Sequence, residues 1–342
     1  MEGGELGPIF NVCLMATLGF SHCYFLSSRL PPGKLRLVSL LPVIYLFTQL
    51  PLLFSTVHLR IISAFFLVWL ATFKLLLFSF SQGPLSDPDL SFLLFLALSS
   101  LPIKLLDDPI RTRRLSLLKI FSYTLKFALL TVIISTYPRR YDYHWTFLLL
   151  VYGVHLYLAI DIVLGFVSFV TLFSIPILAG KKFQFEPHSS PPYLTTSLQD
   201  FWGKRWNLMV TRLLHPAVYV PVKSYLGHSA GTISAFMVSG AMHEVLFYYV
   251  TCRTPTGEVM CFFALQGVCT AVEIGAKKIL GRRKGWKALP TVAAAPLTVL
   301  FVLVTAQWLF LPQLLRNKVD ERVIYESTVI LDAAKTVLGV DL

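Results

Sequence analysis

The stretch that decides how this chain is interpreted is Ile233-Ser-Ala-Phe-Met-Val-Ser-Gly-Ala-Met-His-Glu-Val-Leu-Phe-Tyr-Tyr-Val250. It is apolar on both sides of His243 and long enough to cross much of a bilayer, which takes about 20 residues. An ionisable residue at that depth costs roughly 2.5–3.5 kcal/mol to insert and is therefore a functional candidate. Because imidazole exchanges protons near neutral pH, His243 predicts either chemistry on a lipid or transport of protons.

Composition places the whole chain in the membrane. Of its 342 residues, 55% are hydrophobic and only 14% are charged, whereas soluble domains carry about 25% charged residues. Apolar runs of spanning length recur from end to end, at 9–27, 37–57, 61–81, 90–106, 117–137, 145–164, 166–179, 230–250, 258–275 and 291–311. The runs at 90–106 and 166–179 are short enough to be partial or re-entrant. We therefore expect an all-α polytopic membrane protein with about eight or nine transmembrane helices.

The net charge of +12 does not indicate nucleic-acid binding. Basic residues lie in the short gaps between apolar runs, where lysine and arginine are attracted to anionic headgroups. These residues are Arg29, Lys34 and Arg36, then Arg111, Arg113 and Arg114, then Arg139 and Arg140, and the group from Lys277 to Lys287. They follow both odd and even runs, so the orientation in the membrane stays open. The five cysteines form no Cys-x-x-Cys pair, so neither a zinc site nor a disulfide framework is expected.

The longest polar section lies between 180 and 226, with Ser197-Leu-Gln-Asp-Phe-Trp-Gly-Lys-Arg-Trp-Asn207 at its centre. Thr196 or Ser197, followed by Asp200, predicts a capping box for a helix that starts near 198. Pro216 and Pro221 are expected to break the segment that follows. Four residues at spacings of three and four would share one face of the first helix: Gln199, Trp202, Arg205 and Trp206.

Two interpretations of this face stay open. In the first, the helix lies at the membrane interface, with its tryptophans in the headgroup belt and Lys204 and Arg205 on lipid phosphates. That interpretation accounts for the tryptophans and the charges. It does not explain why Asp200 and Asn207 bracket them. In the second, the segment forms part of a reaction site.

Segment 197–207, followed by Ser239-Gly-Ala-Met-His-Glu244, strongly resembles the plant wax synthase branch of the membrane-bound O-acyltransferase superfamily. Further matching segments lie at 65–78, 267–274 and 304–312, so the resemblance covers nearly the whole chain. It implies many tilted helices, with short interfacial or re-entrant helices, around a reaction tunnel through the membrane. One domain would then occupy 1–342, with N-terminal helices at 1–180, a motif-bearing catalytic half at 181–312 and a tail at 313–342.

The resemblance also implies a set of site residues. It makes His243 the catalytic histidine and Asn207 its partner, 36 residues upstream (243 − 207 = 36). Acyl-CoA would enter the tunnel from the cytosolic side and the acceptor from within the bilayer. No cofactor or metal is expected, because acyl-CoA is itself a substrate. The residues expected to bind substrate are Asp200, Trp202, Lys204, Arg205, Trp206 and Glu244, with Lys204 and Arg205 on either coenzyme A phosphates or lipid headgroups.

Acyl transfer from a thioester to an alcohol requires a base, a donor to the oxyanion and the exclusion of water. A neutral His243 can accept the hydroxyl proton, a contribution of about 10²–10⁴-fold. Asn207 either donates to the oxyanion, worth about 3–4 kcal/mol, or orients the histidine. No cysteine or serine lies in a nucleophile-elbow motif, which favours direct transfer without an acyl-enzyme. A fatty alcohol acceptor would give a wax ester, and a sterol or diacylglycerol would be an alternative acceptor.

A proton-coupled transporter is the competing class. His243, Glu244, Asp161 and Glu273 could form a relay, although no internal repeat supports a transporter fold. A salt-bridged or snorkelling carboxylate is the simpler interpretation of Glu273, which lies seven residues from Gln266 and should share its face. Lys74, in the middle of an apolar run, either snorkels or lines a cavity.

The expected location is the endoplasmic reticulum membrane.

Overall fold

The computed structural model describes residues 4–101, 103–105, 117–179, 183–185, 190–281 and 289–338. Their regular structure is helical, apart from a two-stranded antiparallel sheet in which β1 (Ile103–Leu105) pairs with β2 (Phe183–Phe185). Seven helices among these residues are long and apolar enough to cross a membrane. The predicted class, an all-helical polytopic membrane protein, is confirmed. The chain divides into two compact units. The first consists of Met1–Glu186 together with Lys318–Leu342, and the second of Pro187–Asn317.

The first unit begins with α1 (Leu6–Phe25) and α2 (Lys34–Gln49), which pack through the rings of Phe20 and Phe47. One continuous apolar span, Val57–Ser79, follows as α3 (Val57–Ser63), a π-helical stretch (Ala64–Ala71) and α4 (Thr72–Ser79). About 61% of its window is buried, a larger share than in any other candidate span of the described chain. This span is therefore the centre of the unit, while many apolar side chains of α1 and α2 face outward, as lipid-facing residues do.

The helix in the run at 90–106 is α5 (Phe92–Ser100), which at 1.5 Å per residue is roughly 14 Å long and too short to cross a bilayer, and β1 follows it. Lys74 is buried beside α5. Its ammonium group donates to the carbonyl oxygens of Leu98 and Leu101 at the C-terminal end of α5. Lys74 therefore neutralises the negative end of a short buried helix, rather than reaching toward the membrane surface.

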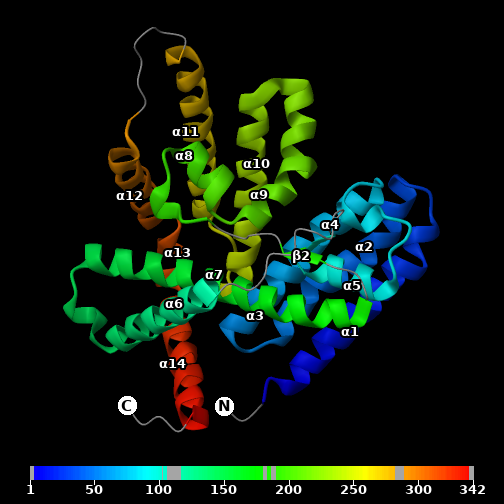
Figure 1. The fold of residues 1–342 in the computed structure, drawn as a ribbon, viewed down its shortest axis with the longest axis horizontal. Helices are drawn as coiled ribbons and strands as arrows, with labels where there is room; N and C mark the ends of the chain where they lie inside the picture. The colour runs from blue at the N-terminus through cyan, green and yellow to red at the C-terminus, as the bar shows by residue number, and fades with distance from the viewer. Residues whose placement is uncertain are drawn as a thin grey trace. The chain divides into compact units, whose positions relative to one another are not determined.

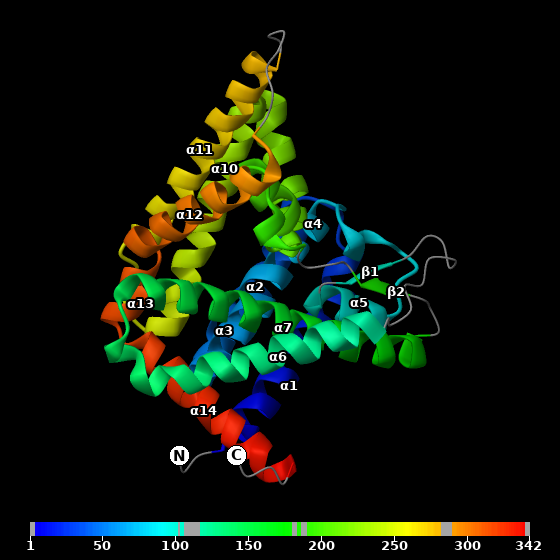
Figure 2. The same ribbon diagram turned by 60° about the vertical axis from the view of Figure 1, so that its left-hand side comes forward.

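The sequence placed two spans at 145–164 and 166–179, and this division is wrong. The structure has one helix, α7 (Trp145–Ala179), which packs antiparallel to α6 (Leu117–Thr136) (Figure 2). Gly165, at the expected break, allows the two helices to approach closely. A Cβ atom there would lie 2.4 Å from the ring of Tyr123 on α6. The glycine therefore serves helix packing and does not end the helix.

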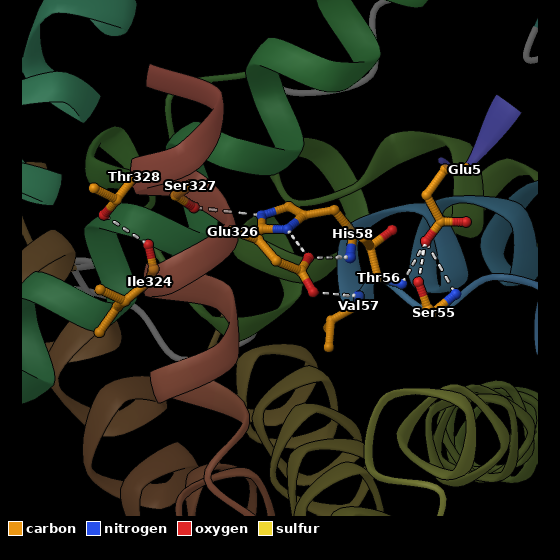
Figure 3. A network of polar contacts seen from close by, with 9 residues as sticks. All are labelled: Glu5, Ser55, Thr56, Val57, His58, Ile324, Glu326, Ser327 and Thr328. Carbon is orange, nitrogen blue, oxygen red and sulfur yellow. Dashed lines mark hydrogen bonds and ion pairs between the residues drawn. The ribbon is translucent and has the colours of Figure 1, made fainter. Parts of the chain in front are cut away.

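The two ends of the chain meet at the beginning of α3 (Figure 3). Glu5 Oε1 accepts hydrogen bonds from the backbone N–H groups of Ser55 and Thr56, at 3.0 and 2.8 Å. Glu326, on α14 (Val319–Leu338), accepts from the N–H groups of Val57 and His58, at 2.7 and 3.0 Å. Four consecutive amides at the start of α3 thus have carboxylate partners, whose negative charge also interacts favourably with the positive end of the helix dipole.

The second unit contains α8 (Leu198–Asp200), α9 (Leu208–Leu214), α10 (Val220–Thr251), α11 (Glu258–Leu280), α12 (Thr291–Leu309) and α13 (Leu311–Arg316) (Figure 1). α9, a π-helical turn (His215–Tyr219) and the start of α10 follow one another up to Gly227, whose φ is +84°. There the chain turns back into the longer part of α10, against the first arm: a Cβ atom at Gly231 would lie 3.0 Å from the carbonyl oxygen of Tyr219. The two arms form a helical hairpin.

The expected breaks at Pro216 and Pro221 do not interrupt this first arm. Each proline occupies the first or second position of its helical element, the π-turn and α10 respectively. Because the arm is continuous, each proline lacks an N–H group that would otherwise bond to a carbonyl of the preceding turn, and the π-helical turn His215–Tyr219 accommodates this loss without ending the arm. Two of the basic clusters predicted to flank the spans lie wholly or partly outside the described residues: Arg111, Arg113 and Arg114, and the residues at 282–287.

Candidate functional site

His243 lies in the longer arm of the hairpin, where α10 packs closely on α11. Gly240 makes this approach possible, because a Cβ atom there would lie 3.0 Å from Cβ of Phe263 and 2.9 Å from Sδ of Met260. One helical turn later, the imidazole of His243 stacks on the ring of Phe263, with centroids 4.2 Å apart and an interplanar angle of 28°. The edge of Phe310 adds a third ring at 6.0 Å. Packing of α10 on α11 therefore positions the histidine.

The hydrogen bond of the imidazole fixes its tautomer. Nδ1 lies 2.7 Å from the carbonyl oxygen of Ser239, one turn earlier on α10. A carbonyl oxygen can only accept, so Nδ1 carries the proton. In a neutral imidazole the other nitrogen, Nε2, then has the lone pair, and Nε2 is the atom that could accept a proton from a substrate.

The surroundings of the histidine are aromatic and buried. Phe247, Phe262 and Phe263 are 5%, 3% and 4% exposed, and they form a core cluster with Val259. Such a cluster keeps water away from any thioester bound against it. The partly buried residues that pack on this cluster are Trp202, Phe236, Val302, Ala306, Leu309, Phe310 and Leu314.

The capping box predicted before 198 is confirmed. Ser197 Oγ accepts from the N–H of Asp200 at 3.2 Å, and Asp200 Oδ2 accepts from the N–H of Thr196 at 3.1 Å. Helix α8 begins at Leu198, as the sequence indicated. After three residues it passes into a π-helical stretch (Phe201–Arg205), and the backbone at Trp206 is extended.

The single face predicted for Gln199, Trp202, Arg205 and Trp206 is therefore wrong for Trp206, because the helix ends before it. Both tryptophans instead pack on Phe201. Trp206 stacks on it at 5.7 Å with an interplanar angle of 11°, and Trp202 meets it edge-on at 5.0 Å. The wide turn of the π-helix changes which side chains share a face, which spacings of three and four do not reveal.

Trp202 reaches the same aromatic cluster as the histidine. Its ring lies edge-on to Phe236 at 5.7 Å and tilted against Phe263 at 6.0 Å. The indole N–H donates to Oε1 of Gln266 at 3.1 Å. Trp202 and His243, 41 residues apart (243 − 202 = 41), thus both contact the ring of Phe263. The sequence identified Trp202 and His243 but not Phe263, because one phenylalanine in an apolar run carries no signal of its own.

Asn207 lies between the π-helical stretch and α9, in the same unit as His243. Its backbone is left-handed, with φ of +41° and ψ of +63°, a conformation that asparagine tolerates better than most residues. Its Oδ1 accepts from the N–H of Val210 at 3.4 Å and caps α9. The cap uses the oxygen end of the amide, and the amide nitrogen is the donor in the predicted role toward the oxyanion. That role stays a prediction.

The charged residues of the segment have different surroundings. Arg205 binds Asp200 through Nε–Oδ2 at 2.6 Å and donates to the carbonyl oxygen of Pro191 at 3.1 Å, whereas Lys204 is exposed. Partial burial tends to raise the pKa of Asp200, but hydrogen bonds from Arg205 and Thr196 outweigh it and hold the pKa below its usual range. Asp200 and Arg205 therefore brace the segment, and of the two basic residues Lys204 is the more accessible to a soluble anion.

Glu244 caps a neighbouring helix. Oε1 accepts from the N–H of Met260 in the first turn of α11 at 2.9 Å, and the residue is 7% exposed. Oε2 has no hydrogen-bond partner among the described residues. The first contact is a structural role, and the substrate-binding role expected from the sequence remains a prediction.

The other carboxylates of the proposed relay are engaged locally. Asp161 in the first unit pairs with Lys126 at 2.7 Å, and Glu273 pairs with Lys277 at 2.6 Å. The salt-bridged interpretation of Glu273 is therefore confirmed. Glu273 also accepts from the N–H of Leu198 at 2.8 Å, on the side of α11 where Gln266 binds Trp202. The parts of the chain that the structure describes contain no group of three or more histidine, cysteine, aspartate or glutamate side chains suited to a metal ion.

Comparison with known proteins bears on the same residues. A sequence model described as "Membrane bound O-acyl transferase family" matches residues 185–265, the segment that contains both Asn207 and His243. A probable long-chain-alcohol O-fatty-acyltransferase 2 from Arabidopsis thaliana is 41% identical over 97% of this chain and 97% of its own length. The long-chain-alcohol O-fatty-acyltransferase of Simmondsia chinensis is 40% identical, over 96% and 95%. An acyl-CoA–sterol O-acyltransferase 1 from Arabidopsis thaliana is 38% identical, over 91% and 92%.

Proposed function

Since the chain belongs to the membrane bound O-acyl transferase family, and is thus an integral membrane O-acyltransferase, we propose that it transfers a fatty acyl group from acyl-CoA to a long-chain alcohol. The product is a wax ester. The observation that carries the proposal is the imidazole of His243, held in one tautomer by Ser239 inside an aromatic cluster. The near-full-length similarity to enzymes named for long-chain alcohols supports this acceptor class.

The reaction proceeds directly between the two substrates. Nε2 of His243 takes the hydroxyl proton as the alcohol oxygen attacks the thioester carbonyl carbon. The tetrahedral oxyanion then collapses, the C–S bond breaks, and the proton on the imidazolium passes to the departing sulfur of coenzyme A. Because Nδ1 is bonded to Ser239, the ring returns to its starting tautomer after each turnover. The aromatic walls limit competing hydrolysis of the thioester.

Asn207 contributes through its amide nitrogen, while its oxygen caps α9. Donation to the oxyanion would stabilise it by about 3–4 kcal/mol, and orienting the histidine is the alternative role. Lys204 binds phosphate groups of coenzyme A, in keeping with its exposure. The ion pair of Asp200 and Arg205 holds the segment in place and so positions Lys204 for this contact. Trp202, Trp206 and Glu244 complete the substrate-binding surroundings.

Sterols are the alternative acceptor, favoured by the 38% identity to a sterol acyltransferase, and diacylglycerol is a further one. All three are apolar molecules with one hydroxyl group, so pocket shape decides among them. A panel of fatty alcohols, sterols and diacylglycerols, each with several acyl-CoA chain lengths, identifies the acceptor by the highest kcat/KM. The endoplasmic reticulum is the proposed location, and no cofactor is part of the proposed reaction.

The decisive test compares two histidines of α10. In purified protein incubated with labelled acyl-CoA and a fatty alcohol, His243→Ala should abolish ester formation. His228→Ala should leave it unchanged, because His228 is exposed and contacts the hydroxyl of Tyr219 at 3.0 Å. Insertion should be normal in both, since alanine is cheaper to bury than histidine. Near-normal ester synthesis by His243→Ala would refute the base, and proton flux without ester would favour the transporter.

A further inference from the structure

We infer that Gln266 is a positioning residue for this reaction: its amide fixes the indole of Trp202 against Phe263, the ring on which His243 stacks. The inference rests on the proposed function, in which His243 is the base. Gln266 does not touch the histidine. It acts through Trp202 and the shared phenylalanine.

The amide of Gln266 is buried and bonded at both ends. The residue is 0% exposed, on the side of α11 that faces the 198–205 segment. Oε1 accepts from the indole N–H of Trp202 at 3.1 Å, and Nε2 donates to Oγ1 of Thr305 on α12 at 2.8 Å. Trp202, from an irregular segment, is thereby linked to two long helices.

Thr305 fixes which way the amide points. Its hydroxyl lies 2.8 Å from the carbonyl oxygen of Phe301, one turn earlier on α12, and donates its single proton there. Its oxygen therefore accepts from Gln266, whose NH₂ group must face α12. The carbonyl end then faces Trp202, where it meets the one donor of the indole. Rotating the amide by 180° would place its NH₂ group against the indole N–H of Trp202 and its oxygen against the lone pairs of the Thr305 oxygen.

A second contact holds the start of the same segment to the same helix. Glu273 lies seven residues beyond Gln266, close to two helical turns, and its Oε2 accepts from the N–H of Leu198 at 2.8 Å. Its other oxygen is held by Lys277. α11 therefore binds the segment at its first residue and at its first tryptophan, and these two bonds set the position of the indole along the helix.

The position of the indole matters because it is one of the rings that confine Phe263. The remaining ring contacts of Trp202, with Phe201, Phe236, Phe262 and Phe263, are apolar and edge-on or tilted, so they do not specify one position. The hydrogen bond to Gln266 is directional and does specify one position of the indole. Without it, Trp202 and Phe263 can shift, and the imidazole that stacks on Phe263 shifts with them. A displacement of 1 Å at a reacting group costs about 10²-fold in rate.

The test begins with two variants of Gln266 and one control. Gln266→Leu removes both hydrogen bonds with little change in size, and we expect kcat to fall roughly 10–100-fold, with KM for acyl-CoA changed less than about threefold. Gln266→Glu should recover most of kcat as the neutral acid, which burial favours: its carbonyl oxygen accepts from the indole N–H and its O–H donates to the oxygen of Thr305. The matched control is Gln199→Leu on the exposed side of the segment, with wild-type kcat expected.

Trp202→Phe deletes the indole N–H and tests the bond from its other partner. If the two residues act through this hydrogen bond, the double variant Trp202→Phe/Gln266→Leu should be no slower than the slower single variant. Additive losses would overturn the inference, and so would a wild-type kcat for Gln266→Leu. Should Gln266→Leu not fold, a wild-type kcat for Trp202→Phe would overturn it equally. Activity retained by His243→Ala refutes the base itself, whereas an inactive His243→Ala with a normal Gln266→Leu refutes only the positioning role.

Discussion

The imidazole of His243 lies face to face with the phenyl ring of Phe263, with centroids 4.2 Å apart, although the two residues belong to different helices. The stack confines one face of the imidazole, and the bond from Nδ1 to Ser239 confines its edge. Two constraints of this kind hold the imidazole in one orientation. In the proposed reaction, a substrate hydroxyl would then meet Nε2 at a reproducible angle, which is what general-base catalysis demands.

Shortening the stacked partner should therefore slow the reaction. We expect Phe263→Leu to lower kcat about 10-fold or more, because the imidazole loses its flat support and samples unproductive orientations. Phe262→Leu is the matched control, since Phe262 contacts Trp202 but forms no ring contact with His243 among the described pairs. Steady-state kinetics with a fatty alcohol measures both. Equal losses in the two variants would assign the effect to general core packing.

Asn207 offers a way to separate capping from catalysis. Asparagine and aspartate are comparable N-caps, so Asn207→Asp should keep the bond to Val210 and the start of α9. It removes the amide donor, and turnover should fall by about 10²–10³-fold if that donor serves the oxyanion. Asn207→Ala should lose as much turnover and also some thermal stability. Full activity in Asn207→Asp would show that only the cap matters.

Direct transfer makes the thiols dispensable. Cys252, Cys261 and Cys269 form no disulfide in the part of the chain that the structure describes, and we expect replacement of each by alanine to leave ester synthesis nearly unchanged. Acid-quenched reactions with labelled acyl-CoA should yield no protein-bound label. A cysteine variant that loses both activity and a covalent label present in the wild type would establish an acyl-enzyme route instead.

The junction of the chain ends predicts a pH-dependent contribution to stability. Partial burial tends to raise the pKa of Glu326, but hydrogen bonds from the His58 side chain and from the N–H groups of Val57 and His58 outweigh it and lower the pKa. A carboxyl whose folded pKa is depressed stabilises the fold above its unfolded pKa of about 4.3. That stabilisation is lost as the pH falls through the folded pKa.

Glu326→Gln should accordingly destabilise the protein at neutral pH, by about 1.5–3 kcal/mol, the usual contribution of hydrogen bonds to a charged group. The difference from wild type should shrink as the pH falls below about 4. Thermal unfolding in detergent across this range measures it. The control is Glu321→Gln on the same helix, because Glu321 is exposed and lies 4.0 Å from Lys318. A deficit that does not change with pH would mean that the charge of Glu326 is not involved.

The local features of the candidate site follow from short stretches of sequence. The capping box at Ser197 and Asp200 formed where its pattern predicted, because both partners lie within one turn of backbone. The sequence also showed the histidine in its apolar run and the short run that contains α5, since the hydropathy and length of an apolar run are read directly from its residues. The near-full-length relatives agree with the family that the motifs indicated.

Contacts between distant segments were decided by tertiary structure alone. Nothing in a sequence pattern pairs Trp202 with Gln266, stacks His243 on Phe263, or brings Glu5 and Glu326 to one helix end. Contacts between helices depend on how closely the helices approach, and single glycines allow that approach: Gly240 where α10 meets α11, and Gly165 where α7 meets α6. Hydropathy measures how much a segment prefers the membrane. It does not record which neighbour a side chain meets there, because lipid and a packed helix are equally apolar surroundings.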